Sequence, residues 1–139
     1  MSLIIDTSDL IGKPFGWGGR GPDFYDCFGI CKKVAERAGI AYPEYPVNMR
    51  TEELVTGAFK SVLKEYEEGE GRWTKLKVVG LPQPLTTILM KSRGKWHMGI
   101  TLSNYGEFIH CIIRHKVNVT TISNPLWNGL IKGYYVYTE

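Results

Sequence analysis

Two different spacings of hydrophobic residues divide the chain. In the N-terminal half the apolar positions recur every three or four residues, which predicts amphipathic helices over residues 27–38 and 51–67. Asp26 stands where it would cap the first of these helices, and Gly39 where it would end it. A short helix is also expected over residues 6–11.

After residue 72 the apolar and polar positions alternate instead, which predicts β-strands. Short polar segments at residues 103–106 and 114–116 predict tight connections between neighbouring strands. The predicted strands comprise residues 73–79, 87–91, 96–102, 107–113, 117–122 and 133–137. Helices followed by a meander of about five to six strands predict an α+β fold, in which N-terminal helices pack on a C-terminal antiparallel sheet.

The composition narrows the class of protein. The chain has 139 residues, 43% of them apolar and 22% charged, which is typical of one soluble domain spanning residues 1–139. The net charge of +3 is too small and too scattered to indicate nucleic-acid binding. No apolar run approaches the ~20 residues of a membrane span, and the N-terminus lacks the pattern of a secretory signal peptide, so we expect synthesis in the cytoplasm.

Cys27 is the strongest candidate for chemistry. The chain has three cysteines, an odd number that argues against a disulfide framework when no export signal is present. Cys27 follows a glycine-rich loop over residues 12–22 and stands in the first turn of the predicted helix, where the helix dipole favours a negative charge. We therefore expect a thiol of lowered pKa that acts as a nucleophile. Burial as a small core residue is the competing interpretation.

A thiol nucleophile needs a base, and two histidines lie in neighbouring predicted strands. His97 and His110 share one face of the sheet if the connection between their strands has an even number of residues, whereas an odd number would separate them. Cross-strand neighbours on one face lie about 5–8 Å apart, so His110 could orient His97, which could take the proton of Cys27. His115 falls in a predicted turn and is expected only to be solvated.

The same side chains also fit a different kind of site. Cys27 and Cys31 are four residues apart on one helix face, and with His97 and His110 they could form a Cys2His2 zinc site. Structural zinc sites more often use tighter loop spacings, so packing of Cys31 inside the helix stripe is favoured and no metal is expected.

Polar and aromatic residues of the glycine-rich loop are candidates for substrate binding. Trp17 could form the floor of a substrate groove, and Arg20 and Asp23 could hold substrate charges. Exposure on a long surface loop explains these residues equally well.

The sequence around these positions resembles a known family. The segments Gly12–Gly19 and Gly21–Ile30 look like the N-terminal signature of the NlpC-type cell-wall cysteine peptidases, and His97–Ile100 with Phe108–His110 is similar to their histidine-bearing strands. The resemblance implies a papain-like fold and hydrolysis of stem-peptide amide bonds in bacterial peptidoglycan, with no metal or organic cofactor.

The same resemblance assigns roles to three side chains. It implies Cys27 as the nucleophile, His97 as the base and His110 as the residue that orients the base. Phe15 and Asp26 match positions near the substrate in the family, so with Trp17 and Arg20 they are the residues that we expect to bind substrate.

One branch of the family is most similar. The segments Asp26–Ile30, Pro43–Tyr45 and Gly133–Tyr135 look like the branch found in phage tails, prophages and gene-transfer particles. The likeness implies a phage or prophage cell-wall hydrolase with phage tail proteins as partners, without nucleic acid or a membrane span. Such a protein would reach the wall from a phage particle or after lysis.

Three positions depart from the family pattern. Phe15 stands where a tyrosine hydroxyl often helps at the oxyanion site, and phenylalanine has no such donor. Phe28 replaces a frequent serine, and Pro84–Thr87 stands where a Gly-Asp pair is usual. These departures favour an alternative, a weakly active or inactive tail-assembly or binding protein on the same fold. An acyltransferase or amidase would use the same residues.

Overall fold

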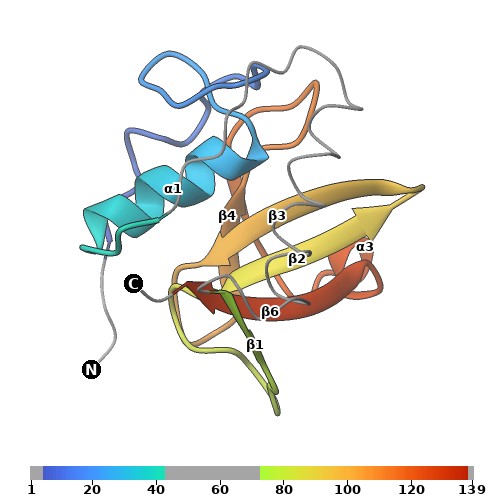
Figure 1. Ribbon diagram of the computed structural model, residues 1–139. Helices are drawn as coiled ribbons and strands as arrows, with labels where there is room; N and C mark the ends of the chain where they lie inside the picture. The colour runs from blue at the N-terminus through green and yellow to red at the C-terminus, as the bar shows by residue number, and fades with distance from the viewer. Residues whose placement is uncertain (1–4, 43–72, 138–139) are drawn as a thin grey trace.

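The computed structural model describes residues 5–42 and 73–137 (Figure 1). The helix predicted over residues 51–67 and the segment Pro43–Tyr45 lie outside these described residues. Among the described helices, none is long and apolar enough to cross a membrane.

Helix α1 (Cys27–Arg37) forms where the hydrophobic spacing predicts it. Asp26 caps its N-terminus, because one carboxylate oxygen accepts a hydrogen bond of 2.6 Å from the Gly29 N–H. At the other end, Gly39 has a φ of +81° and the Ile40 N–H donates to the Ala35 carbonyl, which is the Schellman arrangement that a glycine favours.

The second main part of the described fold is a six-stranded antiparallel sheet. Its strands are β1 (Trp73–Leu76), β2 (Thr87–Ser92), β3 (Lys95–Thr101), β4 (Glu107–His110), β5 (Asn118–Thr121) and β6 (Ile131–Tyr137), in the spatial order β1-β6-β2-β3-β4-β5. The predicted α+β class is therefore confirmed.

The two faces of the sheet are covered by different elements. Figure 1 shows α1 lying across β3 and β4, and its buried side chains pack with Met98, Ile100 and Ile109 on that face. On the other face Phe108 joins a smaller cluster that Trp127 of α3 (Pro125–Asn128) covers. Because side chains alternate along β3, its even-numbered residues pack against α1 and its odd-numbered residues lie on the other face. Helix α3 was not predicted.

Residues 12–15 of the glycine-rich loop form a backbone ladder with residues 115–117, which we call the loop ladder. Its hydrogen bonds join the Gly12 N–H to the Val117 carbonyl (2.9 Å), the Val117 N–H to the Lys13 carbonyl (2.8 Å) and the Phe15 N–H to the His115 carbonyl (3.2 Å). The ladder fixes the glycine-rich loop beside the connection between β4 and β5.

The loop ladder explains two strands that are shorter than predicted. The predicted strands 107–113 and 117–122 are observed as residues 107–110 and 118–121. Because residues 115–117 bond to the loop, they cannot continue the hairpin between β4 and β5, and its connection is longer than the expected tight turn. The predicted strand 73–79 ends at Leu76, beyond which most side chains are exposed.

The short helix predicted over residues 6–11 is wrong. This segment forms hydrogen-bonded turns, in which the N–H groups of Leu10 and Ile11 share the Thr7 carbonyl. Gly12 follows with a φ of +89°, and its N–H donates to the Val117 carbonyl in the loop ladder. The backbone therefore leaves the helical path after a single turn, which is too short to count as a helix.

We predict that Gly29→Ala destabilises the fold. A Cβ at this position would overlap the carbonyl oxygen of Gly19, where the glycine-rich loop crosses α1. The free energy of unfolding should fall by roughly 1–3 kcal/mol, measured by urea denaturation. Gly129→Ala is the matched control, because nothing lies within 4 Å of a Cβ there and its φ of −74° is helical. Equal stability of the two variants would contradict the predicted contact.

Candidate active site

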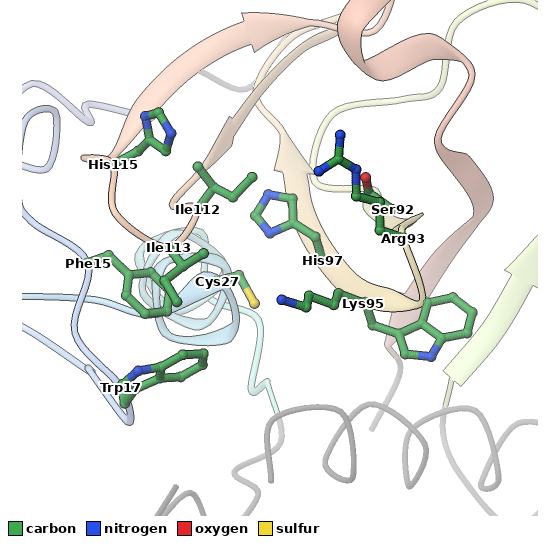
Figure 2. A pocket seen from close by; sticks show the side chains of 11 residues that line it. Phe15, Trp17, Cys27, Ser92, Arg93, Lys95, His97, Ile112, Ile113 and His115 are labelled. Carbon is green, nitrogen blue, oxygen red and sulfur yellow. The ribbon is translucent and has the colours of Figure 1, made fainter. Parts of the chain in front are cut away.

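A pocket of about 500 Å³ lies between the glycine-rich loop, the start of α1 and the tip of the β2–β3 hairpin (Figure 2). Its lining residues are Phe15, Trp17, Cys27, Ser92, Arg93, Lys95, Trp96, His97, Ile112, Ile113 and His115. The rings of Phe15 and Trp17 meet edge to face at 4.9 Å and form one wall. The structure thus brings Cys27 and His97, which are far apart in the chain, to one cavity with the predicted groove residue Trp17. His115, expected only to be solvated, is exposed and lines the same cavity.

Cys27 reaches the pocket from the first turn of α1 and is 5% exposed. Burial raises the pKa of its thiol, and the negative charge of neighbouring Asp26 raises it further. The backbone N–H groups of Met98 and Phe28 donate toward the sulfur and oppose that rise without overcoming it. The expected lowering of this pKa is therefore wrong, because loss of water outweighs the helix dipole.

His97 and His110 contact each other directly. The Nε2 atom of His97 lies 2.8 Å from the Nδ1 atom of His110. They share a face because β3 and β4 pair with Ile100 opposite Ile109 and Thr101 opposite Phe108, which is the even-numbered connection that the prediction required.

Asn118 extends this contact and determines which nitrogen carries each proton. Its side-chain N–H donates to the Lys116 carbonyl (3.0 Å), so its amide oxygen faces His110 Nε2 at 3.1 Å. That nitrogen must donate, which leaves Nδ1 of a neutral His110 as an acceptor. His97 therefore donates from Nε2, and its Nδ1 keeps a lone pair.

Sequence reasoning missed Asn118. The residue pairs directly with His110 across β4 and β5, so cross-strand register is the signal that identifies it. The expected tight turn at residues 114–116 hid that register, because the real connection runs from residue 111 to residue 117.

Both histidines are held in their neutral form. Burial lowers the pKa of His97 to about 3, and the neighbouring His110 adds to the effect. Burial also lowers the pKa of His110 to about 4. The hydrogen bond to Asn118 raises this pKa, but by less than burial lowers it. The ring of Trp127, with its centroid 4.6 Å from that of His110, is part of the apolar cover. At neutral pH the pair is therefore an uncharged base with a fixed tautomer.

Cys27 and His97 approach the pocket from different elements, α1 and β3. Figure 2 shows the Cys27 sulfur and the His97 ring facing the same space. An uncharged thiol and an uncharged imidazole can act together when the thiol proton passes to the ring as the sulfur attacks an electrophile. The arrangement fits nucleophilic acyl chemistry.

Asp26 and Arg20 lie behind this site. Arg20 Nη1 is 2.9 Å from an Asp26 carboxylate oxygen, and the Asp26 side chain is only 3% exposed. The Arg20 guanidinium also lies over the Phe28 ring at 5.1 Å. These contacts orient the start of α1, and substrate binding by Asp26 and Arg20 stays a prediction.

The zinc alternative gains no support from the geometry. Within residues 5–42 and 73–137, no group of three or more His, Cys, Asp or Glu side chains is arranged to hold a metal ion. Cys31 is fully buried in the core between α1 and the sheet, as is Cys111.

Comparison with known proteins identifies the family. Residues 12–135 match the NlpC/P60 family. This chain belongs to the NlpC/P60 family. Its members are typically cell-wall peptidases, so the predicted family is confirmed, whereas the phage branch stays a prediction.

Individual relatives of this NlpC/P60 chain are similar over shorter stretches. A "Probable endopeptidase p60" from Listeria innocua is 40% identical over 42 residues, which are 30% of this chain and 9% of the relative. The protein with the same description from Listeria monocytogenes is 42% identical over 41 residues, 30% of this chain and 8% of the relative. The match spans less than a tenth of these relatives.

Solved structures share the fold. An NlpC/P60 family protein from Bacillus cereus superposes with a TM-score of 0.60 at 16% identity, over 99% of this chain and 42% of the other. NlpC2 from Trichomonas vaginalis gives a TM-score of 0.56 at 18% identity, over 96% of this chain and 44% of the other. This chain therefore spans less than half the length of both proteins.

We predict that the tautomers of the two histidines are fixed by Asn118. At neutral pH, 15N NMR should show His97 and His110 each protonated at Nε2 and bare at Nδ1. In Asn118→Leu the acceptor is gone, so His110 should populate both tautomers, whereas Asn118→Asp keeps an acceptor oxygen and should restore one. Protonation of His97 at Nδ1 in the unmodified protein would contradict the relay.

Proposed function

We propose that this protein is a cysteine endopeptidase that hydrolyses stem-peptide amide bonds in bacterial peptidoglycan. The observation that carries the proposal is the oriented histidine pair at a pocket that also holds the Cys27 thiol, in a chain of the NlpC/P60 family. Cys27 serves as the nucleophile, His97 as the base and His110 as the residue that orients the base.

The proposed reaction begins with attack of the Cys27 sulfur on the carbonyl carbon of the amide. The thiol proton passes to Nδ1 of His97, and the carbonyl oxygen takes up negative charge near the N–H of Cys27, which has no acceptor within its own helix. When the tetrahedral intermediate collapses, the C–N bond breaks and His97 returns the proton to the leaving amine. A water molecule that loses a proton to His97 then hydrolyses the thioester.

The lowered pKa of His97 has two consequences for this sequence of steps. It keeps the ring neutral throughout the neutral pH range, so Nδ1 has a lone pair for the thiol proton, but it also makes the ring a weaker base. The imidazolium formed during attack is stabilised through the Nε2 hydrogen bond to His110, which Asn118 in turn supports.

The biological setting is also part of the proposal. The likeness of Asp26–Ile30 and Gly133–Tyr135 to the phage branch supports a phage tail or prophage hydrolase that meets the cell wall from a phage particle or after lysis. Phage tail proteins are then its expected partners.

We predict that Cys27→Ala and His97→Ala lower digestion of purified sacculi by at least about 100-fold, since general acid–base catalysis alone contributes 10²–10⁴-fold. His110→Asn, which keeps a polar neighbour for His97, should retain more activity than His110→Ala. Mass spectrometry of the released peptides from several wall types measures the rate and identifies the bond. Circular dichroism confirms folding, and full activity of folded Cys27→Ala would exclude the mechanism.

A second candidate function is binding without catalysis, in tail assembly or wall attachment. The observations that favour it are the raised pKa of Cys27 and the presence of Phe15 in the pocket, because the Phe15 ring has no hydroxyl that could support an oxyanion. The two candidates differ in whether His97 activates the thiol.

We predict that His97 controls the reactivity of Cys27. Alkylation of Cys27 by iodoacetamide at pH 7 should slow by about tenfold in His97→Gln if the ring accepts the thiol proton. The rate in the unmodified protein should rise as pH increases toward the raised thiol pKa, because more thiolate is then present. Cys31 and Cys111, both fully buried, serve as internal controls that react more slowly. An unchanged rate in His97→Gln would favour the binding protein.

A further inference from the structure

We propose that Trp127 of α3 is a positioning residue for the reaction, because its indole ring shields the hydrogen bond between His97 and His110 from water and keeps both rings uncharged in weakly acidic solution. The inference rests on the proposed function. It assigns a task to a side chain that does not line the pocket and that acts only through the two histidines.

The Trp127 ring lies against both histidines. Its centroid is 4.6 Å from that of His110, at an interplanar angle of 88°, and 6.0 Å from that of His97. The Phe108 ring contacts His110 from a further direction, at 5.1 Å. A ring that contacts both partners of a hydrogen bond flanks that bond. His110 is 1% exposed whereas Trp127 is only partly buried, so the indole separates the histidine pair from solvent.

Helix α3 holds this ring in place although it is too short to be stable alone. The Asn124 side chain accepts from the Leu126 N–H (3.0 Å) and donates to the Thr120 hydroxyl of β5 (3.3 Å). At the other end the Leu130 N–H donates to the Trp127 carbonyl (2.9 Å), and the Leu130 carbonyl accepts from the Lys91 N–H of β2 (3.0 Å). Strands on both sides therefore fix the backbone that carries Trp127.

The cover prevents one particular event, the addition of a second proton to His110. With Nε2 donating to Asn118, a second proton would occupy Nδ1, the atom that accepts the hydrogen bond from His97. The bond that orients the base would then be lost, and two N–H groups would face each other. Burial opposes this protonation, and the Trp127 ring supplies the part of the burial that faces solvent.

Trp127 can act on the pair only by excluding water, because α3 has no acidic or basic residue. The titratable groups that face the pair come from other elements packed around it, and among the described residues they are Cys27 of α1, Arg93 and Lys95 of the β2–β3 hairpin, His115 of the β4–β5 connection and Tyr134 of β6. A substitution of Trp127 leaves all these groups in the chain. A change in the titration of His110 therefore reports the cover.

The test replaces Trp127 by alanine and follows both histidine rings by 15N NMR between pH 5 and pH 8. In the unmodified protein neither ring should titrate in this range, because burial lowers their pKa values to about 3 and about 4. In Trp127→Ala water reaches His110, and its pKa should rise by about one to two units. The neutral ring should still carry its proton on Nε2 at pH 8, because Asn118 remains as the acceptor.

The same shift should appear in the pH dependence of cleavage of a soluble stem peptide. Between pH 8 and pH 5 the rate should fall about two- to tenfold further in Trp127→Ala than in the unmodified protein, which is the loss of neutral ring that a pKa higher by about one to two units causes. At pH 8 both proteins have neutral rings, so their rates should differ by less than about threefold. A merely structural role would lower the rate by the same factor at both pH values.

Three further variants control for folding and for changes in α3 itself. Trp127→Phe keeps an aromatic cover and should move the pKa of His110 by less than about half a unit. Leu126→Ala is the matched control, because this neighbour in α3 is 74% exposed, and it should change neither the pKa nor the pH profile. If circular dichroism shows that Trp127→Ala does not fold, Trp127→Leu takes its place and should raise the pKa by a smaller amount.

The NMR titration separates this inference from the proposed function, because it needs no turnover. A raised pKa of His110 in Trp127→Ala, in a protein that cleaves no stem peptide, supports the cover and overturns the peptidase. Unmoved histidine pKa values in the folded variant, with an equal loss of rate at pH 5 and pH 8, overturn the cover and leave the peptidase intact.

Discussion

The pairing of β3 with β4 is the constraint on which the site depends. With Ile100 opposite Ile109, both histidines lie on one face and their ring nitrogens meet at 2.8 Å. A slip by a single residue would send one histidine to the face that α1 covers and would bury an unpaired imidazole among aliphatic side chains. Gly99 helps to hold the register, because a Cβ there would meet the Phe108 ring at 2.7 Å.

Burial has opposite effects on the two halves of the site, and together these effects keep it uncharged. It raises the pKa of the Cys27 thiol and lowers the pKa of both histidines, so burial disfavours a preformed thiolate–imidazolium pair. The dipole of α1 favours a thiolate, but the Asp26 cap that starts the helix brings a negative charge next to the sulfur. The same residue thus builds the helix and opposes ionisation of the thiol.

Much of this arrangement could be predicted from residue spacing alone. Helical periodicity located α1 and its Asp26 cap, and alternation located all six strands, because both patterns reflect which side of one element faces the core. The rule that an even-numbered connection places His97 and His110 on one face left both outcomes open, and the pairing of β3 with β4 decides for the shared face. Asn118 was missed because the connection between β4 and β5 was expected to be shorter than it is. The end of the turn at residues 6–11 could not be predicted, because it depends on the hydrogen bond from Gly12 to the distant Val117. Local spacing also gave no measure of how deeply Cys27 is buried.

The loop ladder limits which changes of sequence such a site can tolerate. Phe15 and His115 are bonded to each other at one end of the ladder, and both line the pocket. Lys116, whose carbonyl anchors the Asn118 amide, lies between the bonded residues His115 and Val117. One short stretch of backbone thus sets both the width of the cavity and the orientation of its base. Insertions or deletions within residues 12–15 would disturb proton transfer together with recognition. Substitutions that change substrate recognition without disturbing the histidines are therefore expected on the opposite side of the pocket, in the β2–β3 turn, which is not part of the loop ladder.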